Sequence, residues 1–416
     1  MSKRRKKVVS ITIVLAFLWT AVNGQIINDE TILEVAKNIY RTGNEYGWKE
    51  NDASDREEVV ALLEKAVALY PDNAEARYFL GNAYSRLNSR DARNIVDMNL
   101  ALMYKASEQF EKVIALTPKY TGEIIALDPY SKLSSEWGSM ALRYLILNKT
   151  DSAAWAFREG KKRGAFSDFT LELYKQTLYV TSKNAILLSS GDNPFFSLLY
   201  LQAIDHYRTD VAVVDVGMLN TNWYPAFLTD HKSIAFDLPF ETLDSTDYIV
   251  WTESTVTIND FSWTLKPTYY GSYLLRGDLL LLSMLKENKF QREVFFTAGF
   301  DERNMLGLKE YLTPLVIVSK LSPTGETPSF TDYKRMMTDC LKLSKRLNMN
   351  SIDEHRIFDF FRYTLLNNVS DYLKNNEKQQ AKELMALLDR YANESEYTFM
   401  SDNLKRFADE IRKEIK

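Results

Sequence analysis

The chain has 416 residues, with 52 Lys or Arg, 56 Asp or Glu and a formal net charge of −4. This acidic balance disfavours nucleic-acid binding, and Cys340, the single cysteine, excludes an internal disulfide. The apolar content of 45% suits a chain of two or three domains that is stabilised by its core.

The first residues have the pattern of an export signal. Lys3–Lys7 are basic, Val8–Val22 are mostly apolar, and Gly24 is a small residue suited to cleavage. We therefore predict a secretory signal peptide over residues 1–24, and the absence of a cysteine there excludes a lipoprotein anchor. The alternative is an uncleaved anchor, although a run of about 15 residues is shorter than the ~20 that span a bilayer. Cleavage removes five basic and no acidic side chains and leaves a net charge of −9. We expect a periplasmic or secreted protein with no membrane span after cleavage.

Residues 25–168 are predicted to form tetratricopeptide-like helical repeats. Two stretches, Val59–Pro71 and Leu80–Pro118, follow the helix-turn-helix spacing, the second with an insertion of about a dozen residues. An ordinary helical bundle is the alternative. Repeat arrays usually bind proteins or peptides, so this part predicts a protein partner. The best match to the repeat comprises Trp137, Met140, Ala141, Tyr144, Ala153, Phe157 and Gly160.

Residues 169–325 alternate short apolar runs with amphipathic stretches, which predicts a Rossmann-like α/β domain with a mostly parallel sheet. We expect Asn193 to cap the first helix, with Pro194 at its first position. The predicted strands are Ala185–Leu188, Val211–Val216, Tyr248–Trp251, Thr255–Ile258, Val294–Thr297 and Leu315–Val318, and the predicted helices are Phe195–Tyr207 and Leu279–Lys286.

Two segments of this region, Asn184–Tyr224 and Leu274–Leu312, resemble a known family. They resemble the soluble C-terminal region of bacterial multi-spanning membrane proteins related to protein O-mannosyltransferases, over residues 180–320. In that family the multi-spanning part is presumed to transfer the sugar, and this sequence has no such part. The resemblance therefore implies a soluble envelope module near tetratricopeptide-like helices. The residues that carry it are Gly191-Asp192-Asn193, Tyr207-Arg208-Thr209-Asp210, Leu219-Asn220-Thr221-Asn222-Trp223-Tyr224 and Leu306-Gly307-Leu308 before Tyr311.

Polar residues follow the first two predicted strands, where both turns meet at the carboxyl edge of a parallel sheet. The helix start after the first strand suits an anion, whereas the amides and the indole after the second suit a sugar or a peptide. The alternative is that these side chains only cap and shape their turns. The candidate ligand-binding residues are Gly191, Asp192, Asn193, Asp215, Asn220, Asn222 and Trp223.

Several chemical signatures are missing from the sequence. It contains no Gly-rich dinucleotide fingerprint, no phosphate loop, no His-Glu-x-x-His motif and no Cys/His cluster. We therefore predict no cofactor, no metal site and no catalytic residue. Arg276-Gly277-Asp278 spells an adhesion tripeptide, but we interpret Asp278 as a helix cap.

Residues 326–416 are predicted to be helical and repeat-like, with Leu404–Ile415 as a capping helix and a plain helical region as the alternative. The spacing there rests on Val369, Tyr372, Ala381, Met385 and Leu388.

Two functions follow from these observations. The first is an exported, non-catalytic scaffold or accessory protein that binds a protein partner in the bacterial envelope, linked to protein O-glycosylation, with a membrane glycosyltransferase as a candidate partner. The second is a carbohydrate-active or ligand-binding α/β domain in which Asp192, Asn193, Asp215 and Asn222 converge on one pocket.

Overall fold

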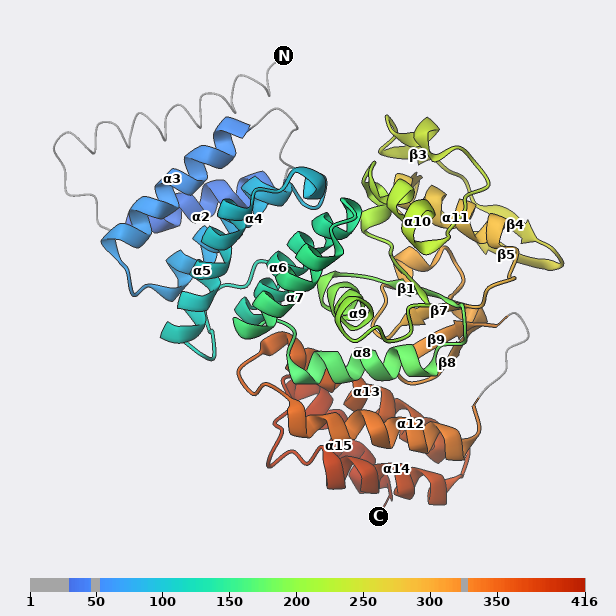
Figure 1. Cartoon of the computed structure of the whole chain (residues 1–416). Coiled ribbons are helices and arrows are strands. Elements are labelled where there is room, and N and C mark those ends of the chain that lie inside the picture. Colours follow the sequence, from blue (N-terminus) through green and yellow to red (C-terminus); the bar gives the residue numbers. More distant parts are fainter. Residues whose placement is uncertain (1–29, 46–52, 323–327, 416) are drawn as a thin grey trace.

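The computed structural model describes residues 30–45, 53–322 and 328–415 (Figure 1). The predicted signal peptide lies outside these ranges. Within them, no helix has both the length and the apolar character that crossing a membrane requires.

In the N-terminal part, the α-helices within residues 30–162 pack side by side in chain order, whereas the helix over residues 168–180 packs on the central part (Figure 1). Glycines allow the closest contacts within this array. A Cβ on Gly81 would lie 2.8 Å from the ring of Phe110, and one on Gly160 would lie 2.6 Å from the Cβ of Trp137. Large side chains thus fill the space that the glycines leave. The helices are α2 (Glu30–Glu45), α3 (Ala53–Leu69), α4 (Ala74–Ser89), η1 (Ile95–Asp97), α5 (Leu100–Leu116), α6 (Pro129–Ile146), α7 (Thr150–Lys162) and α8 (Asp168–Val180).

The central part contains a five-stranded sheet in the order β2-β1-β7-β9-β8. The β1–β2 and β1–β7 pairs are parallel, whereas β9 is antiparallel to both β7 and β8. The sheet is therefore mixed, and the prediction of a mostly parallel sheet was wrong for the side formed by β9 and β8. The strands are β1 (Ile186–Ser189), β2 (Ala212–Asp215), β7 (Val294–Thr297), β8 (Leu312–Pro314) and β9 (Val318–Leu321).

The strand predicted over Leu315–Val318 is largely a tight turn. Val316 has φ +67°, a left-handed value that a strand residue does not adopt, and Leu315 N donates to Val318 O at 2.7 Å. The chain therefore reverses between β8 and β9.

Two predicted strands lie outside the main sheet. β3 pairs only with β6, and β4 only with β5, each as an antiparallel ribbon among the described residues. These strands are β3 (Tyr248–Val250), β4 (Ser254–Ile258), β5 (Phe261–Leu265) and β6 (Tyr273–Leu275). The helices around them are η2 (Met218–Asn220), α10 (Tyr224–Lys232), η3 (Phe240–Leu243), α11 (Arg276–Asn288), η4 (Glu302–Met305) and η5 (Lys309–Tyr311).

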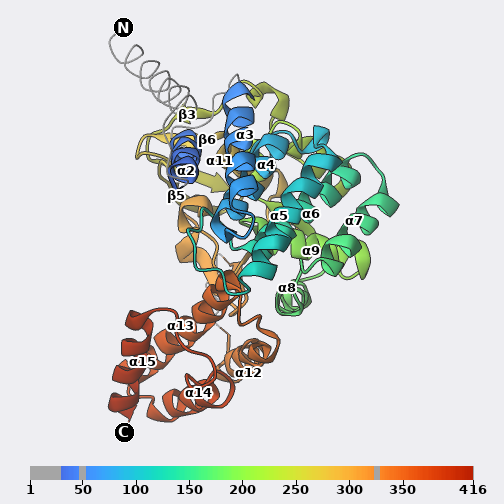
Figure 2. The same cartoon turned by 90° about the vertical axis from the view of Figure 1, so that its left-hand side faces the viewer.

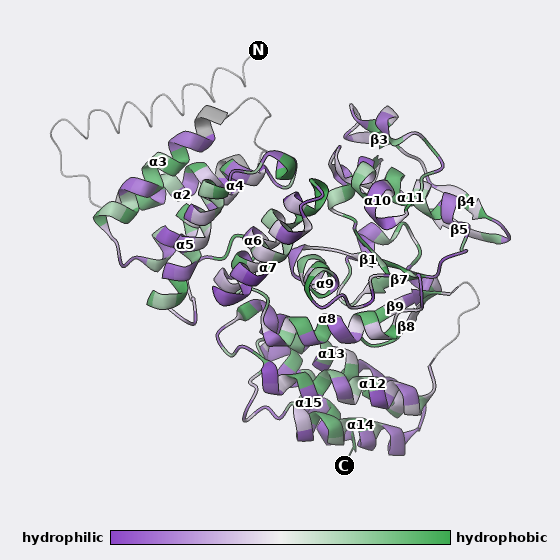
Figure 3. Ribbon diagram, viewed as in Figure 1, coloured by the Kyte–Doolittle hydropathy of each residue, from purple (hydrophilic) through white to green (hydrophobic). Residues whose placement is uncertain are grey.

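Helix α9 (Asp192–Ile204) joins the array to the sheet. It is buried along most of its length, and Figure 3 shows it mainly in hydrophobic colours. A Cβ on Gly138 of α6 would lie 2.3 Å from Cγ of Phe196, so the absence of a side chain brings α6 close to α9. The array and the α/β part therefore share one core.

The C-terminal helices gather at one end of the molecule (Figure 2). Asp128, which caps α6, also accepts hydrogen bonds from Ser351 Oγ at 2.6 Å and from Asp353 N at 3.1 Å, at the start of α13. Asp353 in turn accepts from Asp128 N at 2.7 Å, so the two helix starts cap each other. The helices are α12 (Phe330–Lys342), η6 (Leu343–Arg346), α13 (Ile352–Lys374), α14 (Lys378–Tyr391) and α15 (Asp402–Ile415).

Candidate functional site

The first predicted turn faces the helical array. Helix α9 begins after Gly191, whose φ of +95° suits glycine. Asp192 Oδ2 accepts from Ser135 Oγ at 2.5 Å, and Asn193 Nδ2 donates to Ser131 Oγ at 3.0 Å, both on α6. Asn193 is therefore not the helix cap that the sequence predicted, because the turn is already closed by glycine and the amide reaches another helix.

An internal carboxylate lies at the place expected for an anion. Asp215, at the end of β2, is only 4% exposed, and its Oδ2 accepts from Gly191 N at 3.0 Å. Its Oδ1 accepts from Met218 N at 3.1 Å. Burial raises the pKa of Asp215 to about 7, and the charge of Asp192 adds to this rise. The main-chain N–H at the start of α9 is thus already bonded by a side chain of the protein itself.

The second predicted loop is held by main-chain contacts. Asn220 Oδ1 accepts from Gly277 N at 2.8 Å, and Asn222 Nδ2 donates to Asp244 O at 3.1 Å. Trp223 Nε1 donates to Ala92 O at 2.9 Å, in the loop after α4.

Arg276 holds the same loop through hydrogen bonds to its main chain. Its guanidinium is 2% exposed and donates to Leu219 O at 3.1 Å and to Thr221 O at 2.6 Å. Asp278 Oδ2 accepts from Leu275 N at 2.9 Å and so caps α11, as predicted. The charged side chains of the Arg276-Gly277-Asp278 tripeptide therefore make contacts within the fold.

The predicted site residues are thus in two groups. Asp215 lies beside Gly191, next to Asp192 and Asn193, whereas Asn220, Asn222 and Trp223 face other elements. None of these residues lines any of the three hollows in the described part of the chain that are described next.

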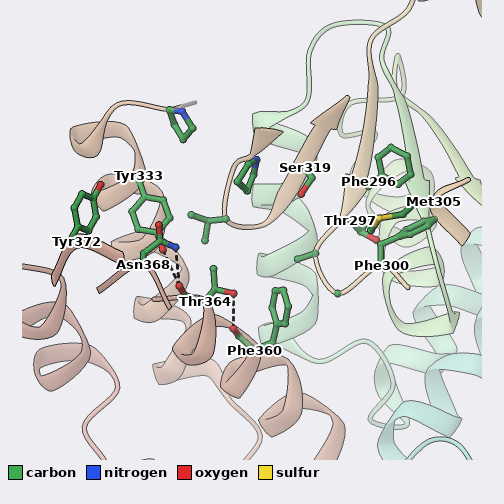
Figure 4. A pocket seen from close by; sticks show the side chains of 15 residues that line it. Phe296, Thr297, Phe300, Met305, Ser319, Tyr333, Phe360, Thr364, Asn368 and Tyr372 are labelled. Atoms are coloured by element: carbon green, nitrogen blue, oxygen red, sulfur yellow. Dashed lines mark hydrogen bonds between the residues drawn. The ribbon is translucent and has the colours of Figure 1, made fainter. Parts of the chain in front are cut away.

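A pocket of about 420 Å³ lies elsewhere, between the carboxyl end of β7 and the C-terminal helices (Figure 4). Thr297 and Phe300 come from the end of β7, and Tyr333, Phe360 and Tyr372 come from α12 and α13. Aromatic rings therefore form much of its wall, which suits a ligand with flat apolar faces.

Polar groups enter this pocket at a few points. Tyr333 Oη lies 3.5 Å from Thr364 O, and Asn368 Nδ2 donates to the same oxygen at 3.0 Å. A smaller hollow of about 220 Å³ shares Ala298, Gly299 and Phe360 with the pocket and continues along α8. The two hollows therefore lie side by side at the junction between β7, α8 and the C-terminal helices.

A third hollow, at the amino end of β2, contains two cationic groups. Burial lowers the pKa of Lys232 to about 8, and its Nζ donates to Gln202 Oε1 at 2.9 Å. Arg292 donates to Asn184 O at 2.7 Å and to Ser233 O at 3.1 Å. These contacts tie α10 to the strand starts.

Sequence comparison gives one family. Residues 171–260 and 231–340 match the family described as TMEM260-associated domain 2. The match spans α8 to α12, less than half of the chain, and covers the segment in which the sequence resembles O-mannosyltransferase-related proteins. It supports that broad family link. No curated protein matches this chain.

Sequence reasoning missed the pocket. The local signal was Ala298-Gly299-Phe300 directly after the buried strand β7, where Gly299 has φ +73°. The opposite wall comes from helices more than thirty residues further along the chain, which no local pattern connects to β7.

Proposed function

We propose that the chain is an exported, non-catalytic accessory protein whose helical repeats bind a protein partner in the bacterial envelope. In this proposal it acts in protein O-glycosylation, beside a membrane glycosyltransferase. The family match and the sequence resemblance, which fall on the same region, support the link to that process.

One observation carries the proposal. At the sheet edge where α/β proteins usually bind ligands, the ends of β1 and β2 are covered by the chain's own helical array, through Asp192, Asn193 and Trp223. Side chains that hold the array in place are not available for a substrate. We therefore assign recognition to the exposed surface of the helical array.

The close packing of α4 to α7 supports a tetratricopeptide-like assignment. Gly81 against Phe110 and Gly160 against Trp137 pair a small with a large residue between helices, as that repeat requires.

An aromatic face on α6 and α7 is the best candidate for the contact. Trp155 is 38% exposed, and its ring lies 5.9 Å from Trp137 and 6.4 Å from Tyr144, with Leu147 also exposed. Rigid aromatic side chains of this kind often anchor protein interfaces.

The test is co-purification from the envelope of the host. Wild-type protein is expected to retain one specific partner, and Trp155→Ala is expected to lose most of it. Tyr179→Ala on α8, where the ring is 76% exposed, is the matched control and should retain the partner. Equal recovery with both variants would contradict the assigned face, and recovery of no specific partner would contradict the function.

A second function is favoured by the pocket at the end of β7. Its size and aromatic lining suit a sugar or another ring-bearing ligand. Saturation-transfer NMR with mono- and disaccharides tests this proposal, with Tyr372→Ala as the pocket variant and Tyr179→Ala as the control. Signals that persist unchanged in Tyr372→Ala would exclude binding there.

A further inference from the structure

The β3–β6 ribbon has one open edge. β3 (Tyr248–Val250) pairs with β6 along one side, and no strand in the described ranges pairs with its other side. The ribbon lies at the outside of the molecule, far from the C-terminal helices in both views (Figures 1 and 2).

The main-chain groups at this edge follow from the register. Trp251 N donates to Ser272 O, and Arg276 N donates to Asp247 O, both at 2.9 Å, so residues 247 and 251 face β6. Because antiparallel strands alternate, the N–H and C=O groups of Tyr248 and Val250 point away from β6. They form the pattern that an added strand needs.

Apolar side chains surround the open edge. Tyr248 is 56% exposed and Val250 is 74% exposed, while Tyr269 and Tyr270 in the adjoining turn are 40% and 82% exposed. The Tyr248 ring lies 5.0 Å from the Tyr273 ring, and the Tyr269 and Tyr270 rings are 4.3 Å apart. The two pairs of rings leave apolar surface exposed near the open edge, which water covers at a free-energy cost.

The surroundings of the ribbon are acidic. Residues 233–265 contain no Lys or Arg, and Asp247 and Glu253 bracket β3, where Glu253 Oε2 also pairs with Lys266 Nζ at 3.6 Å. The six acidic side chains in this stretch, all on exposed residues, are Asp237, Glu241, Asp244, Asp247, Glu253 and Asp260.

We propose that β3 is a docking edge for an extended segment of a partner protein in which Lys or Arg alternates with apolar residues. The segment adds a third strand through Tyr248 and Val250, its basic side chains lie near Asp247 and Glu253, and its apolar side chains lie on the tyrosines. Cations also bind tyrosine faces, which favours the same partner.

Charge favours a basic partner segment over a second copy of the chain or an anionic lipid surface at this edge. A second copy of the chain would bring the same acidic edge against itself, and like charges across paired strands are destabilising. An anionic lipid surface is repelled for the same reason. The surface lies outside the helical array to which the proposed function assigns partner binding, so either assignment can fail alone.

The test uses the full chain and a fluorescent peptide of about eight residues in which lysine alternates with valine. Fluorescence anisotropy is expected to detect binding that weakens as salt rises from about 0.1 M to about 1 M. A peptide with glutamate in place of lysine should not bind. The same lysine peptide with N-methyl groups on its valines should bind about tenfold more weakly, because in an antiparallel pair the valines lie opposite Tyr248 and Val250 and direct their N–H groups at β3.

Two variants of the chain itself test the same edge. Val250→Pro removes one outward N–H at a position where an edge strand tolerates proline, and it should weaken binding about tenfold. Asp247→Asn combined with Glu253→Gln should weaken binding and flatten its salt dependence, while Tyr179→Ser should change neither. Equal binding of the N-methylated and unmodified peptides, equal binding of the glutamate peptide, or no binding at all would overturn the proposal.

Discussion

Glu354, at the start of α13, offers a quantitative test of how the C-terminal helices are held. It is 4% exposed, and its Oε2 accepts from Asn348 N at 2.8 Å. Burial raises the pKa of this carboxyl from 4.5 to about 7. The change of interest is Glu354→Gln, which keeps an acceptor oxygen and removes the charge.

The sign of the pH effect follows from proton binding. Between pH 4.5 and 7 the folded chain holds a proton on Glu354 that the unfolded chain has released. The stability from this group is therefore complete below pH 4.5 and is lost as the pH rises through 7. A rise of this size corresponds to about 3 kcal/mol. Asp215, whose pKa is also raised to about 7, contributes in the same direction.

The assay is urea unfolding followed by tryptophan fluorescence between about pH 5 and about pH 8, a range that contains the transition. Wild-type stability is expected to fall as the pH rises, and Glu354→Gln should remove a large part of this fall and be the more stable protein at the upper end. Glu310→Gln, at an exposed position, is the matched control and should follow the wild type. A Glu354→Gln slope equal to wild type would refute the reasoning.

Three further substitutions test the contacts that close the sheet edge, each by urea unfolding. Gly138→Ala places a Cβ 2.3 Å from Phe196 and should cost about 1–3 kcal/mol, whereas no loss would mean that α6 and α9 separate freely. Arg276→Lys keeps the charge but loses the planar guanidinium that donates to the carbonyls of Leu219, Thr221 and Leu243, and should cost about 2–3 kcal/mol; a neutral result would contradict that role. Trp223→Phe removes the hydrogen bond to Ala92 O, so we expect a loss of about 1 kcal/mol and faster hydrogen exchange in residues 90–94.

Local sequence patterns predicted those helices and strands whose formation depends on residues close together in the chain. The helices containing Trp137 and Gly160 were predicted because their spacing lies within one hairpin, and β7 was predicted to the residue from a fully buried apolar run. The strand predicted over Leu315–Val318 was wrong because apolar composition does not reveal a residue with a left-handed backbone conformation such as Val316. The antiparallel direction of β9 depends on that turn and was missed with it.

The candidate site depended on distant contacts. Asp192 and Asn193 have partners on α6 that lie 57 and 62 residues away in the chain, and Trp223 bonds a carbonyl 131 residues away. Their residue types suited ligand binding and fold contacts equally well. Only the three-dimensional arrangement shows that these side chains hold the array against the sheet.

We propose that the helical array holds a protein partner through its aromatic face on α6 and α7. The most direct measurement is site-specific photo-crosslinking in the host envelope, with a photoreactive phenylalanine in place of Trp155 on α7 and, separately, in place of Tyr179 on α8. We predict one discrete adduct with a single envelope protein from position 155 and none from position 179. No adduct from position 155, or the same adducts from both positions, would contradict the claim.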